Sequence, residues 1–269
     1  MEMRKKVVIS FFRAAGDVLM PRECLVCGAR LGLHERHLCL SCAADVPYTY
    51  WWRQAHNPLA DRFNAVLERH RGTEPMDYAY AAALFLYKGD YRAIPRALKY
   101  HGNLAAGRFF GAQLGRRLAS APHFADVDLI IPVPLHWTRR RSRGYNQAAI
   151  LAQAIASSIN AARSSPVIPG STPSVIPGCR TDILQRVRRT RTQTRLSVDQ
   201  KARNVASAFR VRKSPREALG AARHILLVDD TFTTGATLYA CYAAIRPYTN
   251  ARISVTTLAA VEGTPSGGP

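Results

Sequence analysis

The residues best suited to chemistry form one continuous segment that starts with the apolar run Ile225–Val228. Two carboxylates, Asp229 and Asp230, follow this run, and the small-residue stretch 231–237 comes next. An apolar run of this kind predicts a buried strand, and open α/β sheets bind ligands at the carboxyl ends of their strands. Two adjacent acids at that point suit the neighbouring hydroxyl groups of a sugar.

A helix is expected over 234–245, so it would begin beside the two acids. A helix N-terminus offers unpaired N–H groups and a positive dipole end, which suit a phosphate monoester. Gly235 lets the backbone approach a ligand closely, and Thr233, Thr234 and Thr237 add hydroxyl donors. The alternative interpretation is a helix with a generous Thr and Asp cap after a core strand, without a ligand.

Four cysteines have the spacing of a metal site: Cys24 and Cys27 form one Cys-x2-Cys pair, and Cys39 and Cys42 form another. Two such turns can direct four thiolates at one point, which predicts a structural zinc ion with no open coordination position. Disulfides or a redox pair are the alternatives. His34 and His37 lie between the pairs and are expected to be ordinary loop histidines.

The charge is strongly positive, because 38 Lys and Arg residues against 18 Asp and Glu residues give a net charge of +20. Residues 180–216 contain twelve basic and two acidic residues, and Arg139, Arg140, Arg141 and Arg143 form a second cluster. One interpretation is a solvated, arginine-rich surface. The other is a site for a polyanion, which could be a diphosphate, a nucleic acid or both.

Hydrophobic patterning predicts an α/β domain with a mainly parallel sheet. Strands are expected over 78–87, 127–133, 225–228 and 253–261, and helices over 90–100, 104–118, 144–159 and 234–245. Residues 1–76 would hold a short N-terminal helix, the cysteine module (22–45) and a connector. Residues 77–263 would form the α/β domain, with a mobile Ser/Pro/Gly-rich insertion at 163–178.

No run of 18 or more apolar residues exists, so no membrane insertion is expected. The first 20 residues resemble a signal peptide only weakly, because Arg13 and Asp17 interrupt the apolar stretch. A short amphipathic helix and a cytoplasmic location are the corresponding predictions.

The segment 224–237 resembles the motif that binds phosphoribosyl diphosphate (PRPP) in type I phosphoribosyltransferases. The resemblance implies that Asp229 and Asp230 are catalytic residues that hold the ribose 2′- and 3′-hydroxyls. It also implies that the 5′-phosphate lies on the segment 233–237. The substrate-binding positions would then be Thr231, Thr233, Thr234, Gly235, Ala236 and Thr237.

Motifs spread over nearly the whole chain are similar to those of the ComF family, which has the type I phosphoribosyltransferase fold and is associated with competence for DNA uptake. They are the cysteine module, Ile131-Pro-Val-Pro-Leu135, Arg139-x3-Arg143-Gly144-Tyr145-Asn146-Gln147, Arg191-Thr192-Gln193-x2-Leu196-Ser197 and Arg203-Asn204-Val205. The longer insertion at 163–178 and some extra arginines depart from the family pattern.

The resemblance assigns diphosphate binding to the loop 135–144, with Arg139, Arg143 and Gly144 as its main residues, and a flexible covering loop to residues 189–204. Arginine forks match phosphate oxygens in pairs, although these arginines could simply solvate a loop. Lys99 also lies in a family-like position, and a surface helix lysine is the default interpretation there. Mg²⁺ would accompany the diphosphate.

Two classes of function remain open from the sequence. One is a phosphoribosyltransferase that transfers phosphoribosyl from PRPP to an unknown acceptor. The other is a non-catalytic competence protein that binds single-stranded DNA and retains the fold and the phosphate site. The expected partners are PRPP or a related sugar phosphate, together with single-stranded DNA or other competence proteins. Aromatic residues such as Trp51, Trp52 and Tyr145 could stack on bases, although packing is the default role for each.

Overall fold

The computed structural model describes residues 21–70, 77–164, 176–188, 208–212, 214, 217 and 219–263. The predicted N-terminal helix lies outside these residues, as do most of the insertion at 163–178 and the motif residues between 189 and 207. None of the helices in the described ranges is long and apolar enough to cross a bilayer.

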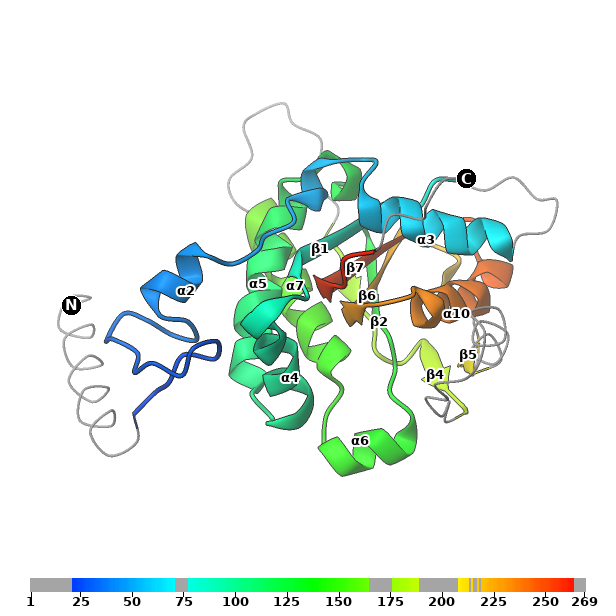
Figure 1. The fold of residues 1–269 in the computed structure, drawn as a ribbon. Helices are drawn as coiled ribbons and strands as arrows, with labels where there is room; N and C mark the ends of the chain where they lie inside the picture. Colours follow the sequence, from blue (N-terminus) through cyan, green and yellow to red (C-terminus); the bar gives the residue numbers. More distant parts are fainter. Residues whose placement is uncertain are drawn as a thin grey trace, which may run out of the picture.

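A sheet of five parallel strands in the order β1-β7-β6-β2-β3 forms the centre of the α/β domain (Figure 1). These strands are β1 (Ala81–Leu86), β2 (Leu129–Pro132), β3 (Gly178–Cys179), β6 (His224–Phe232) and β7 (Arg252–Ala260). A separate antiparallel pair is formed by β4 (Leu184–Arg186) and β5 (Phe209–Val211). The predicted class, a parallel sheet flanked by helices, is confirmed.

Helices cover both faces of this sheet (Figure 1). Helices α4 (Ala93–Tyr100), α5 (Leu104–Ala119) and α7 (Gln147–Arg163) lie on one face, and α3 (Pro58–Arg69) and α10 (Ala236–Ile245) lie on the other. Helix α2 (Leu40–Ala44) belongs to the cysteine module, and α6 (Trp137–Arg143) follows β2. Short 3-10 turns lie at Trp51–Arg53, Gly89–Arg92, Pro122–Phe124 and Arg246–Tyr248.

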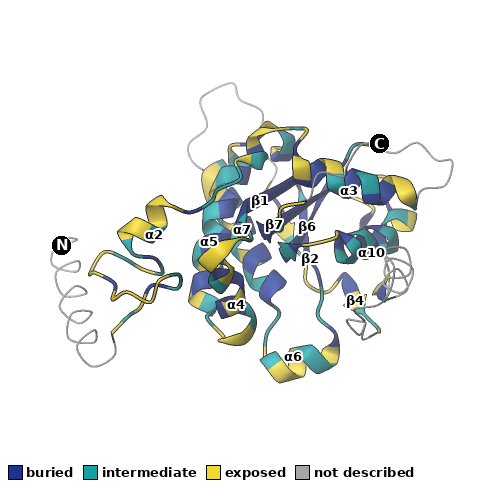
Figure 2. Cartoon of the chain, in the orientation of Figure 1, coloured by how far each residue is buried: buried dark blue, intermediate teal, exposed yellow. Residues whose placement is uncertain are grey.

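Alternating side chains of the central strand divide the core into two layers. Ile225 and Leu227 pack with α3, α10 and the β4–β5 pair, whereas Leu226 and Val228 pack with α4, α5 and α7. Strands β1, β2, β6 and β7 are accordingly buried, and the outer helix faces are exposed (Figure 2). A strand buried on both faces reads as a continuous apolar run, which is why β6 was predictable.

Helices α5 and α7 approach closely because α5 carries glycine at every fourth position of the contact, at 107, 111 and 115. A Cβ atom at Gly115 would lie 2.7 Å from the carbonyl oxygen of Ile155 on α7. The backbones are therefore in direct contact at this point, and a larger side chain has no room. The two helices form the layer of the core against which α4 packs.

Three elements differ from the predictions. Residues 58–69, expected within a connector, form α3, whose Leu59, Phe63 and Leu67 are part of the core. Strand β6 continues through Phe232 because it pairs with β7 along its whole length. The loop predicted over 135–144 contains the helix α6, which projects from the body of the domain (Figure 1).

A polar network joins the amino ends of the strands. The fully buried ring of His224 has Nδ1 2.6 Å from Asp126 Oδ1 and Nε2 2.8 Å from Ser254 Oγ. Asp128 accepts hydrogen bonds from the backbone N–H groups of Arg223 and His224. Because Ser254 is also fully buried, this Asp–His–Ser chain has no access to a substrate and acts as a structural link.

Candidate functional site at the carboxyl edge of the sheet

The carboxyl ends of the parallel strands meet at one edge, and most predicted site residues gather there. Asp229, Asp230 and Thr231 lie in the last half of β6 rather than after it. Helix α10 starts four residues after the strand ends, and α6 follows the end of β2. The sequence therefore placed these residues at the carboxyl edge, as the structure does, but it ended the strand at Val228 instead of Phe232.

Lys99 from the C-terminal turn of α4 completes the acid pair. Its Nζ lies 2.8 Å from Asp230 Oδ2, and it also donates to Thr231 Oγ1 at 3.3 Å. The Lys99 side chain is 24% exposed and that of Asp230 is 6% exposed. The default interpretation of Lys99 as a surface lysine was wrong: this cation is directed into the site.

The two acids have different surroundings. Burial, together with the neighbouring charge of Asp230, raises the pKa of Asp229 to about 8. The backbone N–H of Asp230 donates to Asp229 Oδ1 at 2.8 Å and partly offsets this rise. The edge thus presents one acid that is paired with Lys99 and one that readily takes up a proton, an asymmetry suited to holding two different hydroxyl groups.

The turn between β6 and α10 is shaped by a glycine with positive φ. Gly235 is the N-cap of α10 with φ +78°, and a Cβ atom there would lie 3.0 Å from the ring of Phe232. Thr233 and Thr234 are exposed, while Gly235 itself is buried. Arg62 of α3 donates to the carbonyl oxygens of Thr233 and Val261, so it fixes this turn from behind.

The arginine cluster lies on α6 and ends at Gly144, which has φ +78°. Arg143 donates to Gln147 Oε1 at 3.2 Å, and Asn146 caps α7 while its amide donates to the carbonyl of Val133 at 3.0 Å. These contacts tie the end of α6 to β2 and α7. The arginines are therefore carried by a helix whose C-terminal end is held in place, not by an open loop. Arg140 and Arg141 are exposed to solvent.

Two cavities flank α6. One of about 500 Å³ is lined by Lys99, Tyr100, Gly102, Arg139, Ser142, Arg143 and Tyr145. The other, of about 270 Å³, includes Trp137, Arg140, Gln185, Arg186 and Arg212 in its lining. The second cavity confirms, for the described residues, that the basic segment 180–216 and the α6 cluster lie beside each other.

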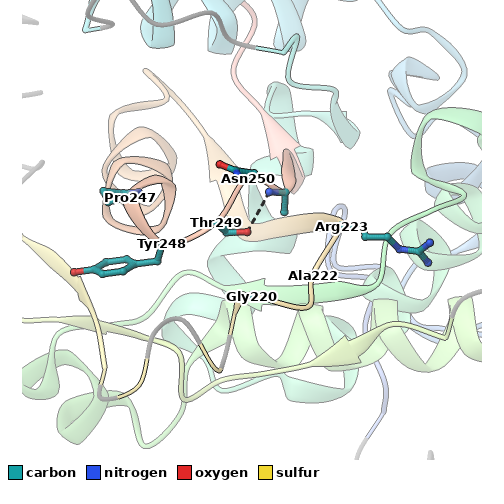
Figure 3. A pocket seen from close by; sticks show the side chains of 8 residues that line it. Gly220, Ala222, Arg223, Pro247, Tyr248, Thr249 and Asn250 are labelled. Carbon is teal, nitrogen blue, oxygen red and sulfur yellow. Dashed lines mark hydrogen bonds between the residues drawn. The ribbon is translucent and has the colours of Figure 1, made fainter.

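A further cavity of about 620 Å³ lies at the opposite, amino edge of the sheet, where Arg223, Tyr248 and Asn250 contribute to its lining (Figure 3). Thr249 accepts a hydrogen bond from the backbone of Ala251 there and so shapes the turn before β7. None of the predicted sugar-phosphate residues lines this cavity. The carboxyl edge, which combines acids, cations and a helix start, is the better candidate for a functional site.

The four predicted metal ligands come together in the N-terminal module. The sulfur atoms of Cys24, Cys27, Cys39 and Cys42 all lie within 4.8 Å of one another, and those of Cys27 and Cys39 are 3.7 Å apart. Burial acts to raise the pKa of Cys24, but backbone N–H donors outweigh it and lower the pKa to about 6. Such a set of thiols can hold a metal ion such as zinc.

Neither histidine of the module belongs to the cysteine cluster among the described residues. The ring of His37 instead packs on Phe109 and Phe110 of α5, with centroids 5.0 and 6.3 Å apart. This contact attaches the cysteine module to the α/β domain. The prediction that these histidines are not ligands agrees with this arrangement.

Several site residues escaped the sequence analysis. Arg186 on β4 is half-buried with its guanidinium over the ring of Phe209, and burial together with the charge of Arg139 lowers its pKa, although Asp229 acts in the opposite direction. Tyr100 and Trp137 are the exposed aromatic residues at this edge, whereas Trp52 is buried and cannot stack on a base. Among these residues, only Trp137 could have been noticed in the sequence, because it directly precedes the arginine cluster.

No protein-family model matches the chain. It is 36% identical over 111 residues to "Competence protein F" of Haemophilus influenzae, which covers 41% of this chain and 41% of that protein. It is 37% identical over 112 residues to "DNA utilization protein YhgH" of Salmonella typhi, covering 41% of this chain and 40% of that protein. The chain thus matches about two fifths of the length of these relatives. Over that part, they confirm the similarity to the ComF family that the motifs predicted.

Proposed function

We propose that this chain binds PRPP with Mg²⁺ at the carboxyl edge of its sheet and transfers the phosphoribosyl group to an acceptor, in a pathway of DNA uptake. The observation that carries the proposal is the acid pair of β6, with Lys99 at 2.8 Å, directly before a glycine-capped helix start. The names of the relatives, which refer to competence and DNA utilization, support the biological setting.

Each part of this edge has a role in the proposed site. Asp229 and Asp230 would accept hydrogen bonds from the ribose hydroxyls, and the N–H groups at the start of α10 would receive the 5′-phosphate. Arg139 and Arg143 would bind the diphosphate. In transfer, the bond from ribose C1 to the diphosphate oxygen breaks, a bond from C1 to the acceptor forms, and the acceptor proton leaves to solvent.

The side chains at this edge supply only part of the ligand set of a magnesium ion. Lys99 already neutralises Asp230, so Asp229 is the carboxylate that could assist a hard cation, and a cation there would favour its ionised form. Most ligands would come from substrate oxygens and water. Mg²⁺, when bound, would neutralise charge on the departing diphosphate.

We also propose that the cysteine cluster holds one structural zinc ion. The proposal is supported by the convergence of the four sulfur atoms and by the soft thiolate donor set, which suits zinc. Four protein ligands would leave no open position, so the ion would organise the module without entering the reaction.

Calorimetric titration with PRPP in the presence of MgCl₂ tests the main proposal. The double variant Asp229→Asn/Asp230→Asn should lose binding, whereas Asp45→Asn, which removes an exposed charge from the cysteine module, should retain it. Unchanged affinity in the double variant would show that PRPP binds elsewhere. Circular dichroism of both variants would establish that the fold is intact.

A second candidate function is binding of single-stranded DNA, which the surface around α6 favours. Trp137 is 67% exposed, and the cavity beside it also contains Arg140, Arg186 and Arg212. An exposed aromatic ring among cations is the usual arrangement for sequence-tolerant binding of single strands. Binding of this kind depends on counterion release and should weaken steeply as salt increases.

Fluorescence anisotropy with a labelled oligothymidylate tests this candidate. Binding at about 50 mM salt should fall by tenfold or more at about 200 mM, and both Trp137→Ala and Arg140→Ala should weaken it. If saturating PRPP and Mg²⁺ leave the affinity unchanged, the two surfaces are separate. Absence of binding at the lower salt concentration would reject the DNA candidate.

A further inference from the structure

Helix α4 lies between the cysteine module and the acid pair. Its last turn carries Lys99, whose Nζ lies 2.8 Å from Asp230 Oδ2. The 3-10 turn Gly89–Arg92 directly precedes the helix and carries Tyr91, whose hydroxyl donates to the backbone carbonyl oxygen of Cys42 at 2.9 Å. Cys42 is one of the four candidate metal ligands. One short segment of the chain therefore contacts the cysteine cluster at its start and the acid pair at its end.

The position of α4 depends on contacts with the rest of the molecule. The helix has eight residues, and helices of this length are marginally stable in water by themselves. Its N-cap residue, Arg92, forms no side-chain capping hydrogen bond to the described residues. The start of the helix is therefore held by packing and by the turn that precedes it.

The cysteine module supplies part of that packing. Cys24 and Leu38 of the module are buried in the apolar layer that α5 and α7 form. Ile94 and Leu98 of α4 belong to the same layer, and Tyr91 is partly buried against it. Because a hydrogen bond requires a defined direction, the bond from Tyr91 fixes where the module lies along this apolar contact.

The cysteine cluster is too far from the acid pair to act on it directly. Eight residues of α-helix span about 12 Å, which separates the two ends of α4. At the far end, the hydroxyl of Tyr145 donates to the carbonyl oxygen of Leu98, and Lys99 also donates to Thr231 Oγ1 at 3.3 Å. A change at the cysteine cluster can therefore reach Lys99 through a displacement of this helix.

We propose that Tyr91 is a positioning residue through which metal binding by the cysteine module holds α4 in place and keeps the ammonium group of Lys99 against Asp230. The inference rests on the proposed function, because it connects the proposed zinc ion with the proposed sugar-phosphate site. Zinc would order the backbone around Cys42 and so fix the carbonyl oxygen that Tyr91 contacts. Loss of the metal would release this contact and loosen the hold on Lys99.

The chemical reactivity of Lys99 tests the inference without a substrate. N-hydroxysuccinimide acetate acetylates lysine amines, and mass spectrometry gives the rate at Lys99 relative to the exposed Lys88. In zinc-loaded protein, Tyr91→Phe should raise this relative rate about threefold or more, because it removes one hydrogen bond at the helix start. Tyr78→Phe, which removes a hydroxyl that donates to Asp61 on α3, is the matched control and should leave the rate unchanged.

Removal of zinc with a chelator tests the metal dependence of the same contact. Chelation should raise the relative rate at Lys99 in the wild type, and by a smaller factor in Tyr91→Phe, because that variant already lacks the link. Hydrogen exchange of peptides from β6 and β7 should remain slow after chelation, since the contact concerns α4 and not the sheet.

The inference is overturned if the rate at Lys99 is unchanged in zinc-loaded Tyr91→Phe, or unchanged in the chelated wild type. Rapid exchange of β6 and β7 after chelation would also overturn it, because the metal would then hold the whole fold. Titration with PRPP is a separate measurement. Failure of the wild type to bind PRPP counts against the proposed function, whereas the rates at Lys99 still decide whether Tyr91 positions the lysine.

Discussion

The ion pair between Lys99 and Asp230 allows a quantitative test of how the site is built. We expect Lys99→Met to be destabilising, because it leaves the 6%-exposed carboxylate of Asp230 without its cation and beside a second acid. Burial acts to lower the pKa of Lys99, but the charge of Asp230 outweighs this, and the pKa is raised. The attraction therefore exceeds the cost of burying the ammonium group.

The size of the effect follows from distance and exposure. At 2.8 Å and an effective dielectric constant of about 20, the attraction is roughly 6 kcal/mol before desolvation is subtracted. Removing one partner of a fully buried pair costs about 3–5 kcal/mol. Because Lys99 lines an open cavity, water can partly replace it, so we expect a loss of about 2–3 kcal/mol.

A double-mutant cycle separates the pair interaction from other effects of substitution. Urea unfolding at pH 7, with zinc in excess, should show that Lys99→Met and Asp230→Asn are each destabilising. The loss of unfolding free energy in the double variant should be smaller than the sum of the two single losses, by about 1.5 kcal/mol or more. Losses that add to within about 0.5 kcal/mol would refute the coupling, and the site would then need another explanation for the buried acid.

The remaining predictions concern the rest of the molecule. Because the pKa of Asp229 is raised, its contribution to stability should be present below about pH 4 and be lost as the pH rises toward about 8; Asp229→Asn should remove at least about 1 kcal/mol of that dependence in urea unfolding. Elemental analysis should find one zinc ion per chain in the wild type and a clear loss of zinc in Cys39→Ser, and stoichiometric retention in that variant would contradict the ligand set. Gly115→Ala should lower the free energy of unfolding by about 2 kcal/mol or more, since the added methyl meets backbone of α7. Asp126→Asn should cost about 1 kcal/mol, measured in the same way, because it weakens the hydrogen bond to the buried His224.

Elements with long apolar patterns were predictable within a few residues. The helix expected over 104–118 is α5 (Leu104–Ala119), and the strand expected over 253–261 is β7 (Arg252–Ala260). Helix α3 was missed because aromatic and polar residues before it suggested a connector. The pair Asn57-Pro58 was nevertheless a start signal: the Asn57 side chain caps the helix, and proline is suited to its first position.

The acid pair shows a different limit of sequence-based prediction. The apolar run stops at Val228, yet the strand continues because Asp229 pairs with Thr257 and Thr231 with Ala259 on β7. An ionised Asp230 inside a buried strand requires a partner, and the partner is Lys99, which is distant in the chain. The local sequence pattern contains no information about that contact. The predicted end of the strand and the interpretation of Lys99 as a surface lysine were therefore both wrong.

The two edges of the sheet differ in the charges that they carry, and this difference supports the proposal of a phosphate site at the carboxyl edge. At the amino edge, Asp126 and Asp128 accept hydrogen bonds from His224 and from backbone N–H groups, so the acids there have protein partners. At the carboxyl edge, burial and the nearby charge of Arg139 lower the pKa of Arg186. An anion bound near both guanidinium groups would offset this repulsion, which is the electrostatic argument for the phosphate site proposed at this edge.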